Sequence, residues 1–330
     1  MPKAKRILVT GATGKVGRTL VKRVLSDPMH DSFEVRALCH HRVLEPNERL
    51  EIVRGSIADL GTVQAIMKDV THVVHLATCK ETPALIMDVA IKGLFWLLET
   101  CRSSQTFKQL ILIGGDAGVG HFYYPHPVPV TEQQEHTAYP GGYALSKVLE
   151  EVMLEQYGIQ YDLNGCCLRA PWIMEKDDLK HHLSFGRDPF GGPRWREMVE
   201  EKQANEFLRT QTIPILLDPK GRPVKRNFVH VDDLVGAILA AIDHPNAHRQ
   251  TFNVCMDEPV DYGELGRYLA ESRGLPTTCV CSPYFSTWLD NSKAKFLLDW
   301  RPEYDMRKLV ELSWRYERDP DDPRIVWYPG

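Results

Sequence analysis

The first half of the chain alternates short apolar runs with stretches in which apolar residues recur at helical spacing. Residues 6–10, 72–76 and 109–114 are nearly uninterrupted apolar runs, typical of strands buried on both faces of a parallel sheet. After the first run, Val16 and Leu20 lie on one face of an expected helix. The same alternation places further strands at residues 34–39, 51–54, 163–168 and 251–254. This order predicts an α/β fold built on a Rossmann-type doubly wound parallel sheet.

The second half of the chain has a looser pattern. We expect a dinucleotide-binding Rossmann domain over residues 1–170 and a smaller C-terminal α/β domain, mainly for substrate binding, over 171–330. Some later segments, such as 226–255, are expected to return to the Rossmann core. Residues 175–193 are rich in charge, His and Gly, which indicates a loop region that faces the substrate.

Polar residues before two apolar stretches predict where helices begin. Asp59 is expected to cap a helix that ends near Met67. Asp232 or Asp233 is expected to cap another that ends near Ile242.

One predicted helix, over residues 84–101, is apolar nearly all the way round. Such a helix must be covered on two sides, and the sheet can cover only one. The helix expected at residues 143–157 is the nearest candidate to cover the other side. We therefore expect a homodimer in which these two helices pair across the subunits.

Composition narrows the class of protein. The 330 residues contain 40 Lys and Arg against 44 Asp and Glu, a net charge of −4, whereas nucleic acids and anionic membranes call for a basic excess. No apolar run reaches the roughly 18 residues that cross a bilayer, and the first residues contain no apolar signal segment. We expect a cytoplasmic protein with neither a nucleic-acid nor a membrane partner.

The ligands that metals prefer are present but are not arranged as a metal site. The eight cysteines form no paired CxxC motifs, and His75, His121, His126 and His230 have no HxH or HxxxH spacing. The sequence therefore predicts no metal.

Glycines directly after the first strand form a candidate dinucleotide cradle. Gly11, Gly14 and Gly17 follow the strand and open a helix, which is the context that such a motif requires. Gly11 permits a tight turn, Gly14 lets the backbone approach a pyrophosphate, and Gly17 allows close packing of helix on strand. The pattern predicts binding of NAD or NADP.

The end of the second strand bears on which of the two cofactors binds. NAD is usually selected by an acidic residue there, whereas this chain has Cys39 followed by His40, His41 and Arg42. No carboxylate would repel a 2′-phosphate, which Arg42 and His40 could hold. The sequence favours NADP weakly, and a solvated Arg42 is the alternative.

Tyr143 and Lys147 form a candidate catalytic pair. They are four residues apart on a predicted helix and therefore lie on one face. A phenol has a pKa near 10, and a neighbouring ammonium favours its ionised form. Tyr143 could then exchange a proton with an alcohol while a nicotinamide exchanges the hydride.

From these residues, the chain resembles the extended short-chain dehydrogenase/reductase superfamily and, within it, the NAD-dependent epimerase/dehydratase family. The resemblance covers almost the whole chain, and its motifs lie at residues 11–17, 74–77, 143–147, 168–171, 226–233 and 290–294. It implies a Rossmann domain with a small C-terminal substrate domain, often in a dimer. Substrates in the family are commonly nucleotide sugars, free sugars or sugar acids.

The resemblance also implies that Leu76, Ala77, Pro171 and the pair Ser56–Ile57 line the cofactor. The family more often has Asp where Ser56 stands. The residues expected to bind the cofactor are Gly11, Thr13, Gly14, Lys15, Val16, Gly17, Cys39, His40, Arg42, Ser56, Ile57, Leu76, Ala77, Thr78, Tyr143, Lys147 and Pro171.

One departure from the family affects the catalytic group. The family normally has a Ser or Thr after the strand at 109–114, hydrogen-bonded to the reacting oxygen. In this chain that place falls on Gly115, and a shift of one residue would put Asp116 there. Asp116 or a hydroxyl such as that of Thr78 is a candidate replacement.

A second departure affects the substrate. Nucleotide-sugar members often carry an Asn near position 172 and an Arg near 226, both used on the nucleotide. Arg226 is present, the Asn is absent, and Trp172 is bulky, which favours a smaller polyol, free sugar or sugar acid.

Cations near these motifs could bind a carboxylate of the substrate. Lys80 and Arg169 are candidates, and a structural salt bridge is the favoured alternative for Arg169. The residues expected to contact substrate are Thr78, Lys80, Asp116, Trp172 and Arg226.

These inferences lead to one expected function and two alternatives. We expect an NAD(P)-dependent oxidoreductase, a dehydrogenase acting on a hydroxyl or hemiacetal of a sugar, sugar acid or polyol. Tyr143 would be its acid/base, with Lys147 tuning the phenol and holding the ribose. The first alternative is an NAD-dependent sugar or nucleotide-sugar epimerase or dehydratase with a retained cofactor. The second is a non-catalytic sensor or scaffold, which Gly115 suggests and the intact Tyr143–Lys147 pair opposes.

Overall fold

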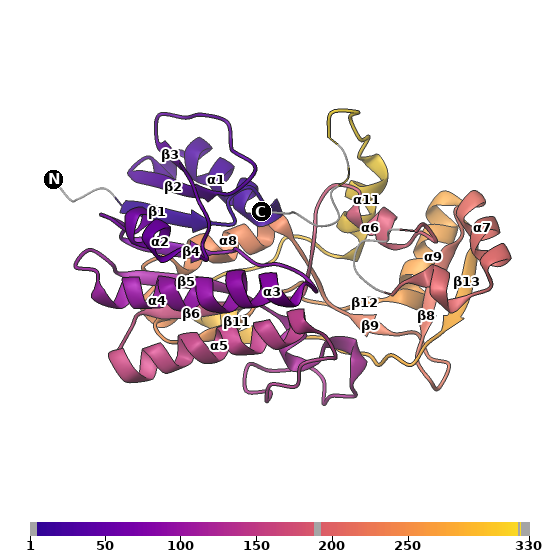
Figure 1. Cartoon of the computed structure of the whole chain (residues 1–330). Helices are drawn as coiled ribbons and strands as arrows, with labels where there is room; N and C mark the ends of the chain where they lie inside the picture. The colour runs from indigo at the N-terminus through magenta and orange to yellow at the C-terminus, as the bar shows by residue number, and fades with distance from the viewer. Residues whose placement is uncertain (1–4, 188–192, 323, 325–330) are drawn as a thin grey trace.

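A seven-stranded parallel sheet forms the larger of two lobes (Figure 1). The computed structural model describes residues 5–187, 193–322 and 324. The strand order is β11-β6-β5-β4-β1-β2-β3, so the chain winds outward in both directions from β1 and β4. The strands are β1 (Lys5–Thr10), β2 (Phe33–Cys39), β3 (Leu50–Arg54), β4 (His72–His75), β5 (Gln109–Gly115), β6 (Gly165–Ala170) and β11 (Thr251–Asn253). This is the predicted Rossmann-type doubly wound sheet.

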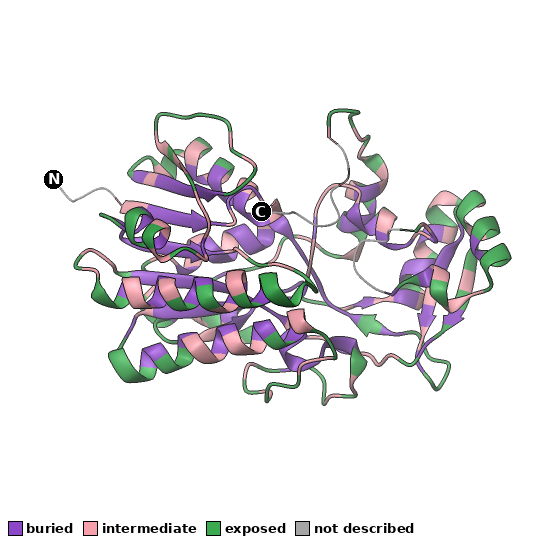
Figure 2. Cartoon of the chain, in the orientation of Figure 1, coloured by how far each residue is buried: buried purple, intermediate pink, exposed green. Residues whose placement is uncertain are grey.

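Helices cover both faces of the sheet, and the core lies between the layers (Figure 2). On one face lie α1 (Lys15–Ser26), α8 (Val231–Ala241) and α10 (Ser292–Leu297). On the other lie α2 (Leu60–Ile66), α4 (Gly93–Ser103) and α5 (Gly142–Tyr161), with α4 and α5 side by side (Figure 1). Because most strand residues are buried from both sides, the strands appear in the sequence as continuous apolar runs.

The smaller lobe has a hydrophobic core of its own, which includes Trp195, Phe228 and Tyr262. Its strands form three two-stranded sheets: β7 (Trp172–Met174) with β10 (Phe228–His230), β8 (Ile213–Leu217) with β13 (Thr277–Cys281), and β9 (Lys225–Arg226) with β12 (Val260–Asp261). Its helices are α6 (Asp178–His182), α7 (Glu201–Arg209), α9 (Tyr262–Arg273) and α11 (Met306–Arg315). Along the whole chain, in both lobes, there are also short 3₁₀ helices: η1 (Pro28–His30), η3 (Asp116–Val119), η4 (His121–Tyr123), η5 (Trp195–Met198) and η6 (Pro245–Ala247).

Several local predictions need correction. The helix expected over 84–101 is divided into α3 (Pro83–Leu85), a π-helical segment η2 (Ile86–Lys92) and α4. The side chain of His230, rather than that of Asp232 or Asp233, caps α8 by accepting a hydrogen bond from the Asp232 N–H. Asp59 caps α2 as predicted. Part of the expected loop region 175–193 is helical in α6, and residues 188–192 lie outside the described part of the chain.

No helix within the described ranges is both long enough and apolar enough to span a bilayer.

Candidate active site

The turn from β1 into α1 lies directly against the end of β4. Gly11 has a φ of +65°, and a Cβ on this residue would lie 2.8 Å from the backbone nitrogen of Ala77 and from the carbonyl carbon of Leu76. The Thr10 Oγ1 accepts hydrogen bonds from two backbone N–H groups after β4, that of Leu76 at 3.2 Å and that of Ala77 at 3.3 Å. The predicted cofactor residues at the ends of β1 and β4 are therefore adjacent in space, at the point where the strand order reverses.

The glycines of this turn leave room for a dinucleotide. A Cβ on Gly17 would lie 2.4 Å from the Gly11 carbonyl oxygen, so only glycine allows α1 to pack this closely on the turn. Gly14 caps α1 without a side-chain hydrogen bond. The first N–H groups of an α-helix have no partner within the helix itself, and the positive end of the helix favours an anion. This backbone fits the pyrophosphate of a dinucleotide.

Three residues that are predicted to bind the cofactor, Thr13, Lys15 and Val16, lie in the turn after β1 and at the start of α1. Thr13 and Val16 are buried, and the Lys15 ammonium binds the Ile173 carbonyl oxygen at 2.8 Å and Asp178 Oδ2 at 2.5 Å. The Lys15 side chain thus ties the cradle to the smaller lobe. Cofactor binding by these three residues stays a prediction.

The ends of β2 and β3 surround the predicted ribose position. Cys39 is buried, and its carbonyl oxygen accepts a hydrogen bond from the Gly55 N–H at 2.9 Å. The His40 side chain lies in the exposed segment that follows, with its ring centroid 3.9 Å from that of His41, and Arg42 is half-buried. After β3, the Ser56 Oγ accepts from the Ala58 N–H. Beside Ser56, Ile57 packs in the core.

Helix α5 places Tyr143 and Lys147 on one face, beyond the end of β5. Lys147 is buried, and its ammonium donates to the Ile113 carbonyl oxygen at 3.3 Å and to Glu150 Oε2 at 2.7 Å. The ammonium lies 5.7 Å from the centroid of the Tyr143 ring. Burial lowers the pKa of Lys147, but the charges of Glu150 and Tyr143 raise it by more than burial lowers it, so the net shift of this pKa is upward. Lys147 is therefore protonated at neutral pH.

A second lysine lies over the Tyr143 ring. The Nζ of Lys80, in the segment after β4, is 3.8 Å from the ring centroid. Thr78, two residues earlier, is exposed. The structure thus brings two predicted substrate residues to the same edge of the sheet as the predicted acid/base.

Asp116, His121 and Arg226 form a hydrogen-bonded chain beyond β5. Asp116 Oδ2 lies 2.6 Å from His121 Nδ1, and His121 Nε2 lies 2.5 Å from Arg226 Nη2. A guanidinium can only donate, so Nε2 must accept and Nδ1 must carry the proton that is donated to Asp116. Burial lowers the pKa of His121 to about 4; Arg226 also lowers it, whereas Asp116 raises it. The imidazole is therefore neutral between a carboxylate and a guanidinium.

Aromatic rings surround the Arg226 end of this chain. The Arg226 guanidinium carbon lies 3.4 Å from the centroid of the Trp172 ring and 4.5 Å from that of Phe122. Arg226 is almost entirely buried, and burial lowers its pKa. The two predicted substrate residues Trp172 and Arg226 therefore stack on each other.

The position of the missing Ser or Thr is open in space. A Cβ on Gly115 would have no neighbour closer than 3.8 Å, the nearest being the Ala170 carbonyl oxygen and the Lys147 side chain. A larger residue is therefore not excluded by packing, and Asp116, the candidate replacement, is the next residue along the chain.

Several predicted site residues lie together at the carboxyl ends of neighbouring strands. Five of them, Gly11, Leu76, Ala77, Asp116 and Pro171, directly follow β1, β4, β5 and β6. Sequence reasoning missed two members of the site, His121 and Glu150. Glu150 is three residues after Lys147, a spacing that places it on the same helical face, whereas nothing in the sequence indicated that His121 would reach Asp116.

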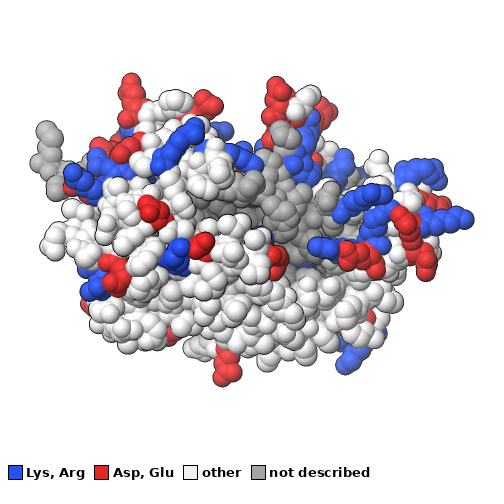
Figure 3. Space-filling view, viewed as in Figure 1, with Lys and Arg blue, Asp and Glu red and all other residues white. Residues whose placement is uncertain are grey.

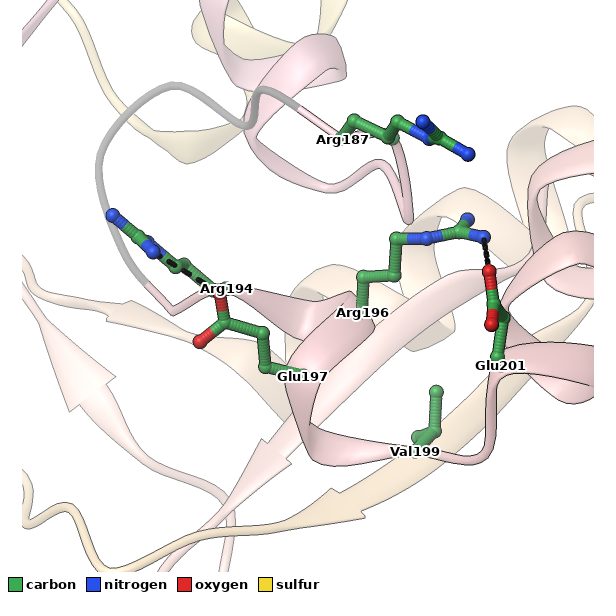
Figure 4. Close-up of a pocket in the computed structure, with 7 residues that line it drawn as sticks. Arg187, Arg194, Arg196, Glu197, Val199 and Glu201 are labelled. Carbon is green, nitrogen blue, oxygen red and sulfur yellow. Dashed lines mark hydrogen bonds and ion pairs between the residues drawn. The ribbon is translucent and has the colours of Figure 1, made fainter.

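One further feature, a cavity, lies apart from this site. A cavity of about 540 Å³ in the smaller lobe is lined by Arg187, Arg194 and Arg196, and Glu197 and Glu201 pair with the second and third of these (Figure 4). None of its lining residues belongs to the cradle or to α5. Figure 3 shows basic and acidic side chains interspersed over the face it presents. Within the described ranges, no three His, Cys, Asp or Glu side chains are grouped so as to hold a metal ion.

A seven-stranded doubly wound sheet, a glycine cradle after β1 and a Tyr–Lys pair on α5 together define an enzyme of the extended short-chain dehydrogenase/reductase type. The model of the "NAD dependent epimerase/dehydratase family" matches residues 7–255, and the chain belongs to this family.

Individual relatives agree with this assignment. The UDP-glucose 4-epimerase of Mycolicibacterium smegmatis is 28% identical over 331 residues, covering 95% of this chain and 99% of the relative. A crystal structure of a short-chain dehydrogenase/reductase superfamily protein from Agrobacterium tumefaciens with bound NAD is 25% identical, with a TM-score of 0.76, and covers 93% of this chain and 95% of that one. The UDP-glucuronic acid 4-epimerase of Bacillus cereus in complex with NAD has the same fold, with a TM-score of 0.72 at 20% identity over 94% of this chain and 98% of that one. The comparisons favour the epimerase or dehydratase alternative over a net dehydrogenase.

Proposed function

We propose that this protein is an NAD-dependent epimerase or dehydratase of a sugar-like substrate, in which the hydride leaves the sugar and returns to it. The observation that carries the proposal is the Tyr143–Lys147 pair, which α5 holds beyond the end of β5, at the same sheet edge as the glycine cradle. The similarity to a UDP-glucose 4-epimerase over nearly the full length supports the retained-cofactor reaction over net oxidation.

The cradle residues would hold the cofactor. Gly11, Gly14 and Gly17 leave the backbone of the β1–α1 turn open to the pyrophosphate, and the buried Lys147 ammonium can bind ribose hydroxyls. When bound, a nicotinamide supplies the acceptor and donor of hydride. We propose NAD because the similar Agrobacterium protein contains it. The preference for NADP suggested by Arg42 stays a prediction.

Tyr143 and Asp116 would act on the reacting hydroxyl. The phenol oxygen of Tyr143 takes the proton as the hydroxyl is oxidised and returns it when the carbonyl is reduced. Asp116 replaces the family Ser or Thr by accepting a hydrogen bond from the same or an adjacent hydroxyl. His121 donates to one Asp116 oxygen, and Arg226 fixes the His121 tautomer, so the Asp116 side chain is held in a fixed orientation.

A net dehydrogenase is the second candidate, because of how Arg226 is used. Its guanidinium is buried against Trp172 and Phe122 and is hydrogen-bonded to His121. These contacts restrict how the guanidinium could bind the diphosphate of a nucleotide sugar. A smaller free sugar, sugar acid or polyol fits this arrangement.

A substrate panel separates the two candidates. We would incubate the protein with NAD or NADP and with UDP-sugars, free aldoses, uronic acids and polyols, following sugar configuration by NMR and nicotinamide absorbance together. We expect the configuration of a UDP-sugar to change with no net increase in absorbance. Accumulation of reduced cofactor in proportion to product would favour the dehydrogenase.

We also propose that α4 and α5 form a homodimer interface. Apolar side chains on or just before these helices are exposed: Leu85 is 50%, Phe95 40%, Leu145 53% and Ile159 57% exposed. Patches of this kind commonly mark contacts with another protein. We expect a dimer in sedimentation at micromolar concentration, and the double substitution Phe95→Glu and Ile159→Glu should shift it to monomer. A wild-type protein that sediments only as a monomer would contradict the proposal.

A further inference from the structure

Lys147 is not a lone positive charge, because a buried carboxylate lies against it. Glu150 has no exposed surface, and its Oε2 accepts from the Lys147 ammonium at 2.7 Å. The other oxygen, Oε1, has no hydrogen-bond partner within the described residues. Burial raises the pKa of Glu150, and the Lys147 charge opposes that rise. An ionised group at this depth is stable only when paired, so Glu150 and Lys147 form one electrostatic unit.

The pairing changes what Lys147 can do for Tyr143. Glu150 keeps the ammonium protonated and fixes its position near the Ile113 carbonyl oxygen. The same carboxylate offsets the positive field that reaches the phenol, since the two opposite charges are 2.7 Å apart and the ring centroid is 5.7 Å from the ammonium. The positive field of Lys147 at Tyr143 is therefore weaker than that of an unpaired ammonium.

Lys80 places a cation closer to the centre of the Tyr143 ring than Lys147 does. Its Nζ is 3.8 Å from the Tyr143 ring centroid, and it comes from a different element, the exposed segment after β4. A cation over a ring is attracted to a phenol and more strongly to a phenolate, which carries a negative charge.

Other titratable groups around this pair come from the segments after β4 and β5, from the neighbouring strands and from α5 itself. They are His75, Cys79, Glu81, Asp116, Tyr139, Glu151 and Cys167. Burial lowers the pKa of His75 to about 3 and raises the pKa values of Cys79, Tyr139 and Cys167, so these four are neutral near pH 7. Among the acidic groups, Asp116 is bound by His121, Glu151 by Arg169, and Glu81 accepts from the Gly142 N–H.

We propose that the work of the catalytic lysine is divided in this enzyme: Lys147, held by Glu150, is a fixed ribose-binding cation, and Lys80, which lies over the Tyr143 ring, is the cation that stabilises the ionised form of Tyr143. Lys80 and Glu150 are both positioning residues, because each acts through another side chain. The inference rests on the proposed function, in which Tyr143 exchanges the proton.

The Lys80 half is tested by titrating Tyr143 in protein without sugar or nucleotide. The tyrosinate ultraviolet difference spectrum of each variant is measured, and that of the same variant carrying Tyr143→Phe is subtracted. We expect Lys80→Met to move the midpoint of the Tyr143 signal upward by about 0.5–1 pH unit, less at high salt. Lys80→Arg, which stays charged at every pH used, should leave the midpoint at or below that of the wild type. Lys202→Met, an exposed lysine on α7, should not change it.

The Glu150 half is tested by NAD affinity as a function of pH. In Glu150→Gln, burial of Lys147 is no longer opposed by a carboxylate, so the ammonium loses its proton at lower pH than in the wild type. We expect NAD affinity of this variant to decline as the solution becomes mildly alkaline, where the wild type still binds.

Each measurement can overturn the proposal independently. An unchanged Tyr143 midpoint in Lys80→Met removes the role of Lys80, and identical pH profiles of NAD affinity remove that of Glu150. Because Lys80 is exposed, we expect Lys80→Met to fold, so the Tyr143 titration can be measured even if Glu150→Gln does not fold. The tyrosine titration uses no substrate, so its failure is distinct from an inactive wild-type enzyme, which would contradict the proposed function itself.

Discussion

The substitution Tyr143→Phe is expected to lower the kcat of sugar interconversion by about 10²–10⁴-fold while leaving the fold and NAD affinity nearly unchanged. Phenylalanine keeps the ring that Lys80 and Lys147 contact, but it has no oxygen to exchange a proton with the substrate. The loss should therefore fall on kcat and kcat/KM together, as for an interaction made in the transition state. Steady-state kinetics and an NAD titration measure the two quantities.

A matched control is available on the same helix. Tyr161 ends α5 and is 47% exposed, and Tyr161→Phe removes the same hydroxyl far along the helix from Lys147. Its kcat should equal that of the wild type. Full activity in Tyr143→Phe would exclude Tyr143 as the acid/base.

Replacing Arg169 with Met should destabilise the protein by about 3–5 kcal/mol. Arg169 on β6 and Glu151 on α5 are both buried, and the guanidinium contacts both carboxylate oxygens, with Nη2–Oε2 at 2.7 Å and Nε–Oε1 at 3.2 Å. Methionine leaves the Glu151 carboxylate buried with His136 as its remaining partner at 3.2 Å. Chemical denaturation at neutral pH measures the loss.

The same ion pair gives stability a defined pH dependence. Burial raises the pKa of Glu151, but the hydrogen bond from His136 and the charge and hydrogen bonds of Arg169 lower it to about 2, from an ordinary 4.5. Because the folded-state pKa is the lower one, the pair stabilises the fold above the unfolded-state pKa, by about 3 kcal/mol. This contribution disappears as the pH falls from about 4.5 to about 2. The Arg169→Met variant should lose most of it.

A surface pair provides the comparison. Arg102 and Glu99 on α4 are as close, at 2.7 Å, but their side chains are 41% and 30% exposed. Arg102→Met should cost about 0–1 kcal/mol, since water screens the pair. Equal losses in the two variants would show that burial of Arg169 does not determine its contribution.

Predictions from sequence succeeded where the signal is local. The strands of the large sheet are continuous apolar runs because helices cover both faces, and the cradle glycines follow β1 without interruption. The cap of α2 by Asp59 is likewise formed within three residues, from the Thr62 N–H to the Asp59 carboxylate. Each of these features depends on neighbours in the sequence.

The features that were not predicted depend on contacts distant in sequence. Strand β9 is two residues long and pairs with β12 some 35 residues later, so no run of apolar residues could mark it. The Lys15 ammonium binds Asp178, 163 residues away, and no local pattern marks this contact between the two lobes. Arg226 binds His121 across 105 residues, so the hydrogen-bonded group of Asp116, His121 and Arg226 could not be predicted from the sequence.

One further prediction failed for a local reason. The apolar stretch at 84–101 has the composition of one continuous helix, but η2 within it adopts π-helical hydrogen bonding, which differs from the α-helix by one residue per bond. Apolar periodicity does not distinguish these two patterns, so the division at Ile86 and Gly93 had no signature in the sequence.

The most direct test of the proposed reaction is the fate of the hydrogen on the carbon whose configuration changes. A substrate that the panel shows to be converted would be labelled there with deuterium, mixed with unlabelled substrate, and the products analysed by mass spectrometry. If hydride leaves and returns within one bound sugar, we expect each labelled molecule to keep its deuterium, with no transfer to unlabelled molecules and no release of reduced NAD. Deuterium recovered in free reduced NAD, together with an oxidised sugar, would contradict the proposal and establish a dehydrogenase.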